Sequence, residues 1–142
     1  MGEGAIQILC GGLGTLAYAL FFHVSPLHLI LATLGGALSW LLYLLVLARD
    51  GNVFLSALVA SMGVCLWSEG MARVRKAPAN IFMIPGIIPL LPGVAFTNAI
   101  RDIADEDYIS GTVRLLDVIL VVVCAAFGVG LVMAGYNACM GV

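Results

Sequence analysis

Charged side chains are scarce in this chain. Only 10% of its 142 residues are Asp, Glu, Lys or Arg, whereas soluble domains carry about 25%. Hydrophobic residues make up 63%, and the mean hydropathy is +1.15. This composition excludes an ordinary soluble domain, because too little polar surface is left to face water. A lipid bilayer fits instead, and at about 20 residues per helix the chain holds at most about seven spans.

The sequence also has few basic residues and no recognisable metal or nucleophile motif. Its six Lys and Arg residues form no cluster larger than Arg73, Arg75 and Lys76, and the net charge is −2, which argues against nucleic acid as a partner. The four cysteines are isolated in apolar surroundings, so we interpret them as packing residues. We expect no enzyme activity, no metal and no cofactor.

Apolar runs predict an all-α integral membrane protein, a helical bundle of about five segments in a single membrane domain over residues 1–142. Pro26 is well placed to begin the second helix, and residues 49–52 form a polar turn after it. Ser110 is a candidate cap for the last helix. We interpret residues 101–111 as a short solvated connection. The predicted segments are residues 4–22, 27–47, 53–72, 81–100 and 112–136.

The fourth segment is apolar but cannot form an undisturbed helix. Pro85, Pro89 and Pro92 fall within eight residues, and Gly86 and Gly93 accompany them. Each proline removes a backbone donor and clashes with the preceding turn, so we expect a break in this segment. Lipid cannot satisfy the freed carbonyl groups, so the break should face protein or water. Helical spacing would place the five residues along one stripe.

Discontinuous membrane helices often direct the N-termini of half-helices at anionic substrates, because the helix dipole favours negative charge there. We therefore hypothesise that the proline stripe lines a substrate path; the alternative is a kink that only improves packing. Thr97, Asn98 and Arg101 follow on the same segment and could offer hydroxyl, amide and guanidinium groups to a polar substrate. Helix capping and snorkelling by Arg101 are the competing interpretation.

Two acidic residues are candidates for proton coupling. Glu69 precedes Arg73 by four residues near the end of the third span, and Asp117 follows Arg114 by three at the start of the last span. Ion pairing at the membrane interface is the simpler interpretation of both. Because ionisable groups within a bilayer are costly and usually functional, either carboxylate could instead carry a proton.

The charge pattern leaves the orientation open. Arg73, Arg75 and Lys76 favour a cytoplasmic end for the third span. If the fourth segment crosses, the basic residues divide three to each side; if it is re-entrant, five lie inside and one outside. Segment length favours crossing. We expect five segments with the N-terminus outside.

Residues 76–93, KAPANIFMIPGIIPLLPG, resemble the small-subunit domain of the threonine/serine exporter family, and the similarity extends through residues 95–130. The resemblance implies efflux of a small carboxylate solute: threonine, serine, or a dicarboxylate such as succinate. It also implies a larger partner subunit with a cytosolic N-terminal part and about five spans. Such a partner would start inside, which agrees with an inverted arrangement of the two subunits.

We therefore predict the small subunit of a two-component secondary exporter in the cytoplasmic (inner) membrane. An ion gradient would drive it, since no nucleotide-binding loop is present. The predicted substrate path is the proline and glycine set followed by Thr97, Asn98 and Arg101. The alternative is a non-transporting scaffold subunit of a larger complex. Small residues at four-residue spacing are compatible with a homo-oligomer.

Overall fold

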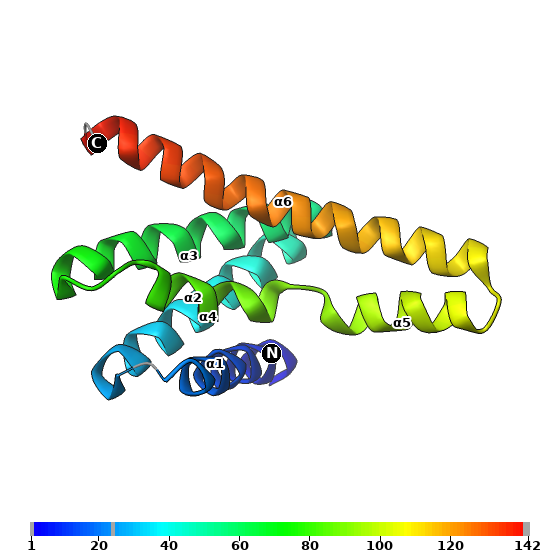
Figure 1. Cartoon of the computed structure of the whole chain (residues 1–142), viewed down its shortest axis with the longest axis horizontal. Coiled ribbons are helices and arrows are strands. Elements are labelled where there is room, and N and C mark those ends of the chain that lie inside the picture. The colour runs from blue at the N-terminus through cyan, green and yellow to red at the C-terminus, as the bar shows by residue number, and fades with distance from the viewer. Residues whose placement is uncertain (1, 24, 141–142) are drawn as a thin grey trace.

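The computed structural model describes residues 2–23 and 25–140, and over these residues it contains helices and no strand (Figure 1). This confirms the predicted all-α fold class. The helices in chain order are α1 (Gly2–Phe21), α2 (Pro26–Asp50), α3 (Val53–Arg75), α4 (Asn80–Ile87), the 3₁₀ helix η1 (Ile88–Leu90), α5 (Gly93–Ala104) and α6 (Tyr108–Met140).

Four of these helices are long and apolar enough to cross a membrane: the segments Gly4–Phe21, His28–Asp50, Val53–Arg75 and Tyr108–Cys139. The predicted fourth segment is broken, as expected. Its two parts, Asn80–Leu90 and Gly93–Ala104, are bent by 48° relative to each other and would make a fifth span if counted as one. The chain is a multi-pass membrane protein.

Local sequence signals explain where α2 and α3 begin and end. Pro26 occupies the first turn of α2, as predicted. Gly51 ends this helix with a φ of +65°, a conformation that costs glycine little. Asn52 then caps α3, because its Oδ1 accepts a hydrogen bond from the backbone N–H of Phe54 at 3.0 Å. The polar turn between the two helices is therefore tightly fixed.

Small residues bring the helices close together. A Cβ at Gly11 would lie 2.9 Å from the ring of Trp40, so α1 and α2 pack tightly as an antiparallel hairpin. A Cβ at Gly128 would lie 2.6 Å from the carbonyl oxygen of Leu58, which brings α6 against α3. Such close backbone approach through glycine is the usual basis of helix packing in membranes, where burial of apolar surface gives little driving force.

The broken segment passes through the depth of the bundle. Phe82 on α4 is buried and packs near Met71 towards the end of α3. Leu90 at the end of η1 packs against Ala60 in the first half of α3. Pro92 then lies near Val53, at the start of α3. The chain thus runs antiparallel to α3 from one end of the bundle to the other.

Helix α5 continues beyond the α2–α3 turn, where, among the described residues, it packs only against α6 (Figure 1). The 33 residues of α6 correspond to about 50 Å, whereas a hydrocarbon core is about 30 Å thick. Residues 93–117 therefore form a helical hairpin that projects past the α2–α3 turn. We call this the α5–α6 hairpin.

The predicted connection over residues 101–111 was too long, because only residues 105–107 link the two helices, although most of the stretch is exposed as expected. Helix α5 has an apolar face that packs on α6. Ala99 on this face is buried, and Ile103 lies so close to α6 that a Cβ at Gly111 would overlap it. The predicted cap was wrong. Asp107 Oδ1 accepts the backbone N–H of Ser110 at 3.3 Å, so Asp107 caps α6 in place of Ser110.

Candidate functional site

The first half of the broken segment belongs to the core of the bundle. Pro85 and Gly86 are buried, and a Cβ at Gly86 would lie 2.9 Å from Val64 Cγ1 on α3. Ser39 Oγ on α2 donates to the carbonyl of Gly36 at 2.7 Å and lies 3.5 Å from the carbonyl of Gly86. A polar group of a neighbouring helix thus approaches the backbone just before the break, as the absence of water in lipid requires.

The helix loses its regular form between Ile88 and Gly93. After the 3₁₀ turn of η1, Leu91 is extended with φ −71° and ψ 133°, and Pro92 has ψ 61°. The backbone N–H of Leu91 still reaches the carbonyl of Ile88 at 3.1 Å. Helix α5 restarts at Gly93 in a new direction. The break therefore lies at residues 91–92, at the end of the bundle where α2 meets α3.

The prolines do not form the single stripe that the sequence predicted. Pro85 is buried and Pro89 is half-buried, with its Cγ 3.9 Å from where a Cβ at Gly14 would lie on α1. Pro92 instead lines a pocket beside α6, and Gly93 is exposed. The spacing argument failed because the 3₁₀ turn and the extended residue change the rotation between successive residues.

An open pocket of about 770 Å³ lies at this break. We call it the turn pocket, because the α2–α3 turn forms one wall while the starts of α5 and of the embedded part of α6 form the others. Its apolar surface comes mainly from Val53, Phe54, Pro92, Ala95, Val118 and Val121. Its polar groups come from Asp50, Asn52, Arg114 and Asp117.

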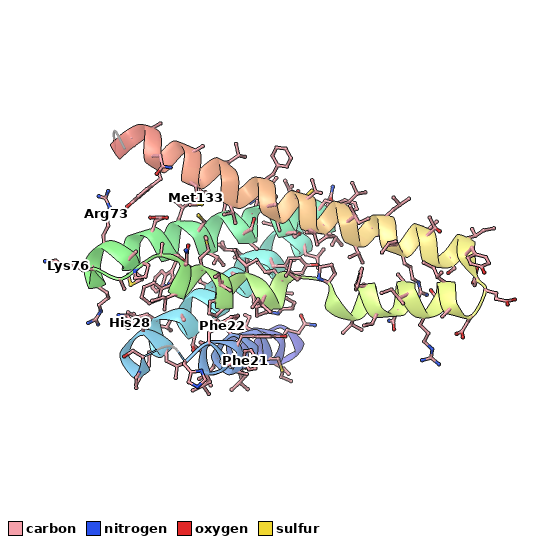
Figure 2. The ribbon with its side chains drawn as sticks, viewed as in Figure 1. Phe21, Phe22, His28, Arg73, Lys76 and Met133 are labelled. Atoms are coloured by element: carbon pink, nitrogen blue, oxygen red, sulfur yellow. The ribbon has the colours of Figure 1, made fainter. Side chains whose placement is uncertain are left out.

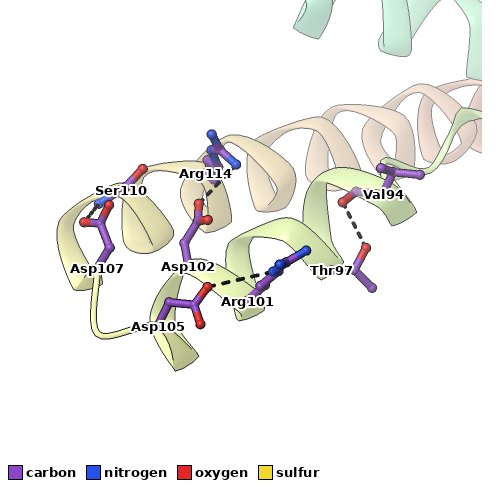
Figure 3. Close-up of polar contacts among 8 residues, drawn as sticks. All are labelled: Val94, Thr97, Arg101, Asp102, Asp105, Asp107, Ser110 and Arg114. Carbon is purple, nitrogen blue, oxygen red and sulfur yellow. Dashed lines mark hydrogen bonds and ion pairs between the residues drawn. The ribbon is translucent and has the colours of Figure 1, made fainter.

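The charged groups of the turn pocket are of both signs. Arg114 forms an ion pair with Asp102 on α5, with Nη1 and Oδ2 3.1 Å apart (Figure 3). Asp50 and Asp117 are exposed carboxylates on opposite walls. Asn52 contributes a side-chain amide, and its oxygen already accepts a hydrogen bond from the backbone N–H of Phe54 in α3. One guanidinium and nearby carboxylates can together bind a ligand that carries both a negative and a positive group.

The predicted polar residues of α5 lie outside the turn pocket. Thr97 Oγ1 donates to carbonyl groups of its own helix, those of Gly93 at 3.0 Å and Val94 at 2.9 Å. Asn98 is exposed. Arg101 pairs with Asp105 along the helix, with Nε and Oδ2 3.8 Å apart, on the outer surface of the α5–α6 hairpin (Figure 3).

The two candidate proton carriers lie at opposite ends of the bundle. Asp117 lines the turn pocket, next to the start of α3, whereas Glu69 is partly buried near the end of α3. The expected pair between Glu69 and Arg73 is not formed. Arg73 lies instead over the ring of Tyr136, with its Cζ 4.9 Å from the ring centroid, a cation–π contact between α3 and α6.

Sequence reasoning missed Asp50 and Asn52 and treated Arg114 only as a neighbour of Asp117. A polar turn after an apolar span gives no sign that it lines a pocket, since the other wall comes from a distant part of the chain. Within residues 2–23 and 25–140, no group of three or more His, Cys, Asp or Glu side chains could hold a metal ion.

Comparison with known proteins places most of the chain in one family. The family model described as "Threonine/Serine exporter, ThrE" matches residues 7–134. This match confirms the resemblance seen in the sequence around the broken segment. No curated protein and no solved structure matches significantly.

Proposed function

The chain belongs to the threonine/serine exporter family, and we propose that it is the small membrane subunit of a two-component secondary exporter of small carboxylate solutes. The family is one of transporters, so the multi-pass membrane helices are expected to surround a solute path rather than an enzyme site. The proposed location is the cytoplasmic membrane. The proposed partner is a larger subunit with a cytosolic N-terminal part and about five spans.

The observation that carries this proposal is the position of the break. The first part of the broken segment lies within the bundle, and Pro92, at the break, lines the turn pocket. Transporters often build substrate sites at the breaks of discontinuous helices, where irregular backbone lines a cavity. A path from the Lys76 end of the bundle to this pocket would pass the half-buried Pro89 and Pro92, and the buried Pro85 would shape the segment behind them.

The charged residues have proposed roles along that path. Glu69 and Asp117 are the candidate proton carriers at its two ends. Arg101, on the exposed side of the α5–α6 hairpin, would attract carboxylates to the outer end of the path. Thr97 and Asn98 would line this end if the hairpin rotates during transport. An ion gradient would supply the free energy.

The test is export of labelled threonine or serine from vesicles that contain this chain with its partner. A Pro89→Ala, Pro92→Ala double variant should have an export rate well below that of the wild type, because the segment would then form a more regular helix across the break. The matched control is Pro78→Ala, which changes an exposed proline in the α3–α4 turn and should export normally. Undiminished export by the double variant would contradict the proposed path.

A second candidate function is a non-transporting scaffold subunit. It is favoured by an apolar stripe on α6 in which Ile109, Val113 and Leu116 have exposed fractions of 83%, 56% and 54%. These residues recur every three to four positions and thus share one helix face. Because these residues lie on the part of α6 that projects past the α2–α3 turn, this face offers a surface to another membrane subunit.

The scaffold hypothesis predicts that an Ile109→Ser, Val113→Ser variant dissociates a larger complex on native gels of membrane extracts. It also predicts that vesicles containing the chain and its partner move no solute. Chain-dependent export would rule the scaffold function out as the sole role of the chain.

A further inference from the structure

We propose that the turn pocket binds an α-amino acid as a zwitterion and discriminates against dicarboxylates. This inference rests on the proposed export function and narrows its substrate class. It assigns the ligand carboxylate to Arg114 and Asn52 and the ligand ammonium group to Asp117 and Asp50. The supporting observations are the pocket's size, the placement of its charges and their balance.

The pocket has the dimensions and lining of a small-molecule site. Its volume of about 770 Å³ lies within the usual range of about 300–1,000 Å³ for such sites. Apolar side chains, with Pro92, Val118 and Val121 among them, make up much of its lining. A few polar groups converge on this apolar surface, which is the arrangement that fixes the orientation of a small ligand. The volume exceeds that of one amino acid, so water would complete the contacts.

The carboxylate-binding side is formed by Arg114. The Asp102 carboxylate engages one end of its guanidinium, and the side chain is still 53% exposed. A guanidinium has five N–H donors in a planar fork, so donors remain for a second carboxylate. Asn52 adds a side-chain amide: its oxygen accepts from the backbone of α3, which leaves its two N–H donors for a ligand. Asp102 acts here as a positioning residue for Arg114.

The ammonium-binding side is formed by two carboxylates. Asp117 lies one turn after Arg114 on the same helix, and Asp50 faces it from the α2–α3 turn. Neither makes an ion pair among the described residues. An ammonium group has three donors, so it can bond to a carboxylate of the pocket and still donate to water or to a second acceptor.

The charge balance decides between the two solute classes. The turn pocket and the Asp102 partner of Arg114 hold three carboxylates against one guanidinium. A dicarboxylate would add two more negative charges to this excess, and like charges at close range raise the free energy of binding. A zwitterion instead pairs with both signs. The pocket therefore favours amino acids over solutes such as succinate.

The proposal is tested by measuring binding to the full chain in lipid nanodiscs with calorimetry, using L-threonine and three probes. Threonine methyl ester lacks the carboxylate, 3-hydroxybutyrate lacks the ammonium group, and succinate carries two carboxylates. Loss of a charge-assisted hydrogen bond corresponds to about a tenfold weakening or more. Each probe should therefore bind at least about tenfold more weakly than threonine.

Variants locate the site. Asp117→Asn and Arg114→Gln should each weaken threonine binding by about tenfold or more. The matched controls are Glu106→Gln, in the exposed turn of the α5–α6 hairpin, and Arg75→Gln, at the opposite end of the bundle; both should bind like wild type. The Asp117 side chain makes no hydrogen bond or ion pair with the described residues, so Asp117→Asn remains informative if Arg114→Gln fails to fold.

Three results would overturn the proposal: no saturable binding of threonine, succinate binding as tight as threonine, or unchanged binding by both pocket variants. Export measured in parallel separates this inference from the function. If the chain with its partner exports threonine and the pocket variants do so with wild-type concentration dependence, the site is wrong and the function stands. If threonine binds as proposed but no chain-dependent export occurs, the site stands and the function is wrong.

Discussion

Arg114 on α6 and Asp102 on α5 are joined by an ion pair, with Nη1 and Oδ2 3.1 Å apart. The Asp102 side chain is only 24% exposed, so this pair is partly shielded from water. The Arg101–Asp105 pair is longer, at 3.8 Å, and both side chains are more than two-thirds exposed. Exposed ion pairs contribute little to stability. The Asp102 pair is therefore the charge contact that fixes α5 on α6 and holds Arg114 at the turn pocket.

Removing this pair should loosen the α5–α6 hairpin. In an Asp102→Asn variant, the backbone amides of α5 should exchange with solvent faster, because α5 packs only on α6 among the described residues. The free energy of local opening of α5 should fall by about 1 kcal/mol, which makes the open state about five times more populated. Asp105→Asn is the matched control and should leave exchange in α5 nearly unchanged. Equal exchange rates in both variants would show that apolar packing alone holds the hairpin.

The α3–α6 contact should depend on one glycine. Alanine favours a helix over glycine by about 1 kcal/mol, yet Gly128→Ala should lower the unfolding temperature. Its Cβ would lie 2.6 Å from the carbonyl oxygen of Leu58, a backbone atom that cannot move without shifting α3. Gly130→Ala, on the same helix, meets nothing within 4 Å and should be neutral or stabilising. Thermal unfolding in detergent measures both, and equal effects would contradict this account of the contact.

The sequence predicted the helices and the break because both follow from local chemistry. Long apolar runs specify spans, and Pro85, Pro89 and Pro92 each remove a backbone donor wherever they are placed. The start of α2 at Pro26 follows from the same local rules. These features need no knowledge of which helix packs against which.

The turn pocket could not be predicted, because its walls are brought together by tertiary structure. Asp50 and Arg114 belong to separate apolar segments, and their proximity depends on the broken segment crossing the full bundle. The α5–α6 hairpin was missed for a different reason. The acidic residues after Arg101 suggested a loop. The apolar positions of α5 are too few to indicate a helix in this part of the sequence.

The broken segment runs along the bundle, so that Lys76 and Asp105 lie at opposite ends of the molecule. Lys76 and Arg73 lie at one end of the bundle, and the turn of the α5–α6 hairpin lies at the other (Figure 2). The six basic residues divide equally between these ends: Arg73, Arg75 and Lys76 at one, and Arg49, Arg101 and Arg114 at the other. The positive-inside rule counts basic residues near the span ends, so it favours neither orientation.

Labelling with a membrane-impermeant thiol reagent tests the crossing directly. In a background in which the four native cysteines are replaced by alanine, Lys76→Cys and Asp105→Cys should react from opposite sides of the membrane. With the N-terminus outside, as expected from the sequence, Lys76→Cys reacts from the cytoplasmic side and Asp105→Cys from the outside. Both positions are exposed, so access depends on the side of the membrane and not on burial. Glu106→Cys serves as a second reporter in the same turn and should match Asp105→Cys. Reaction of positions 76 and 105 from the same side would mean that the proline segment is re-entrant, and the path proposed from one end of the bundle to the turn pocket would then be wrong.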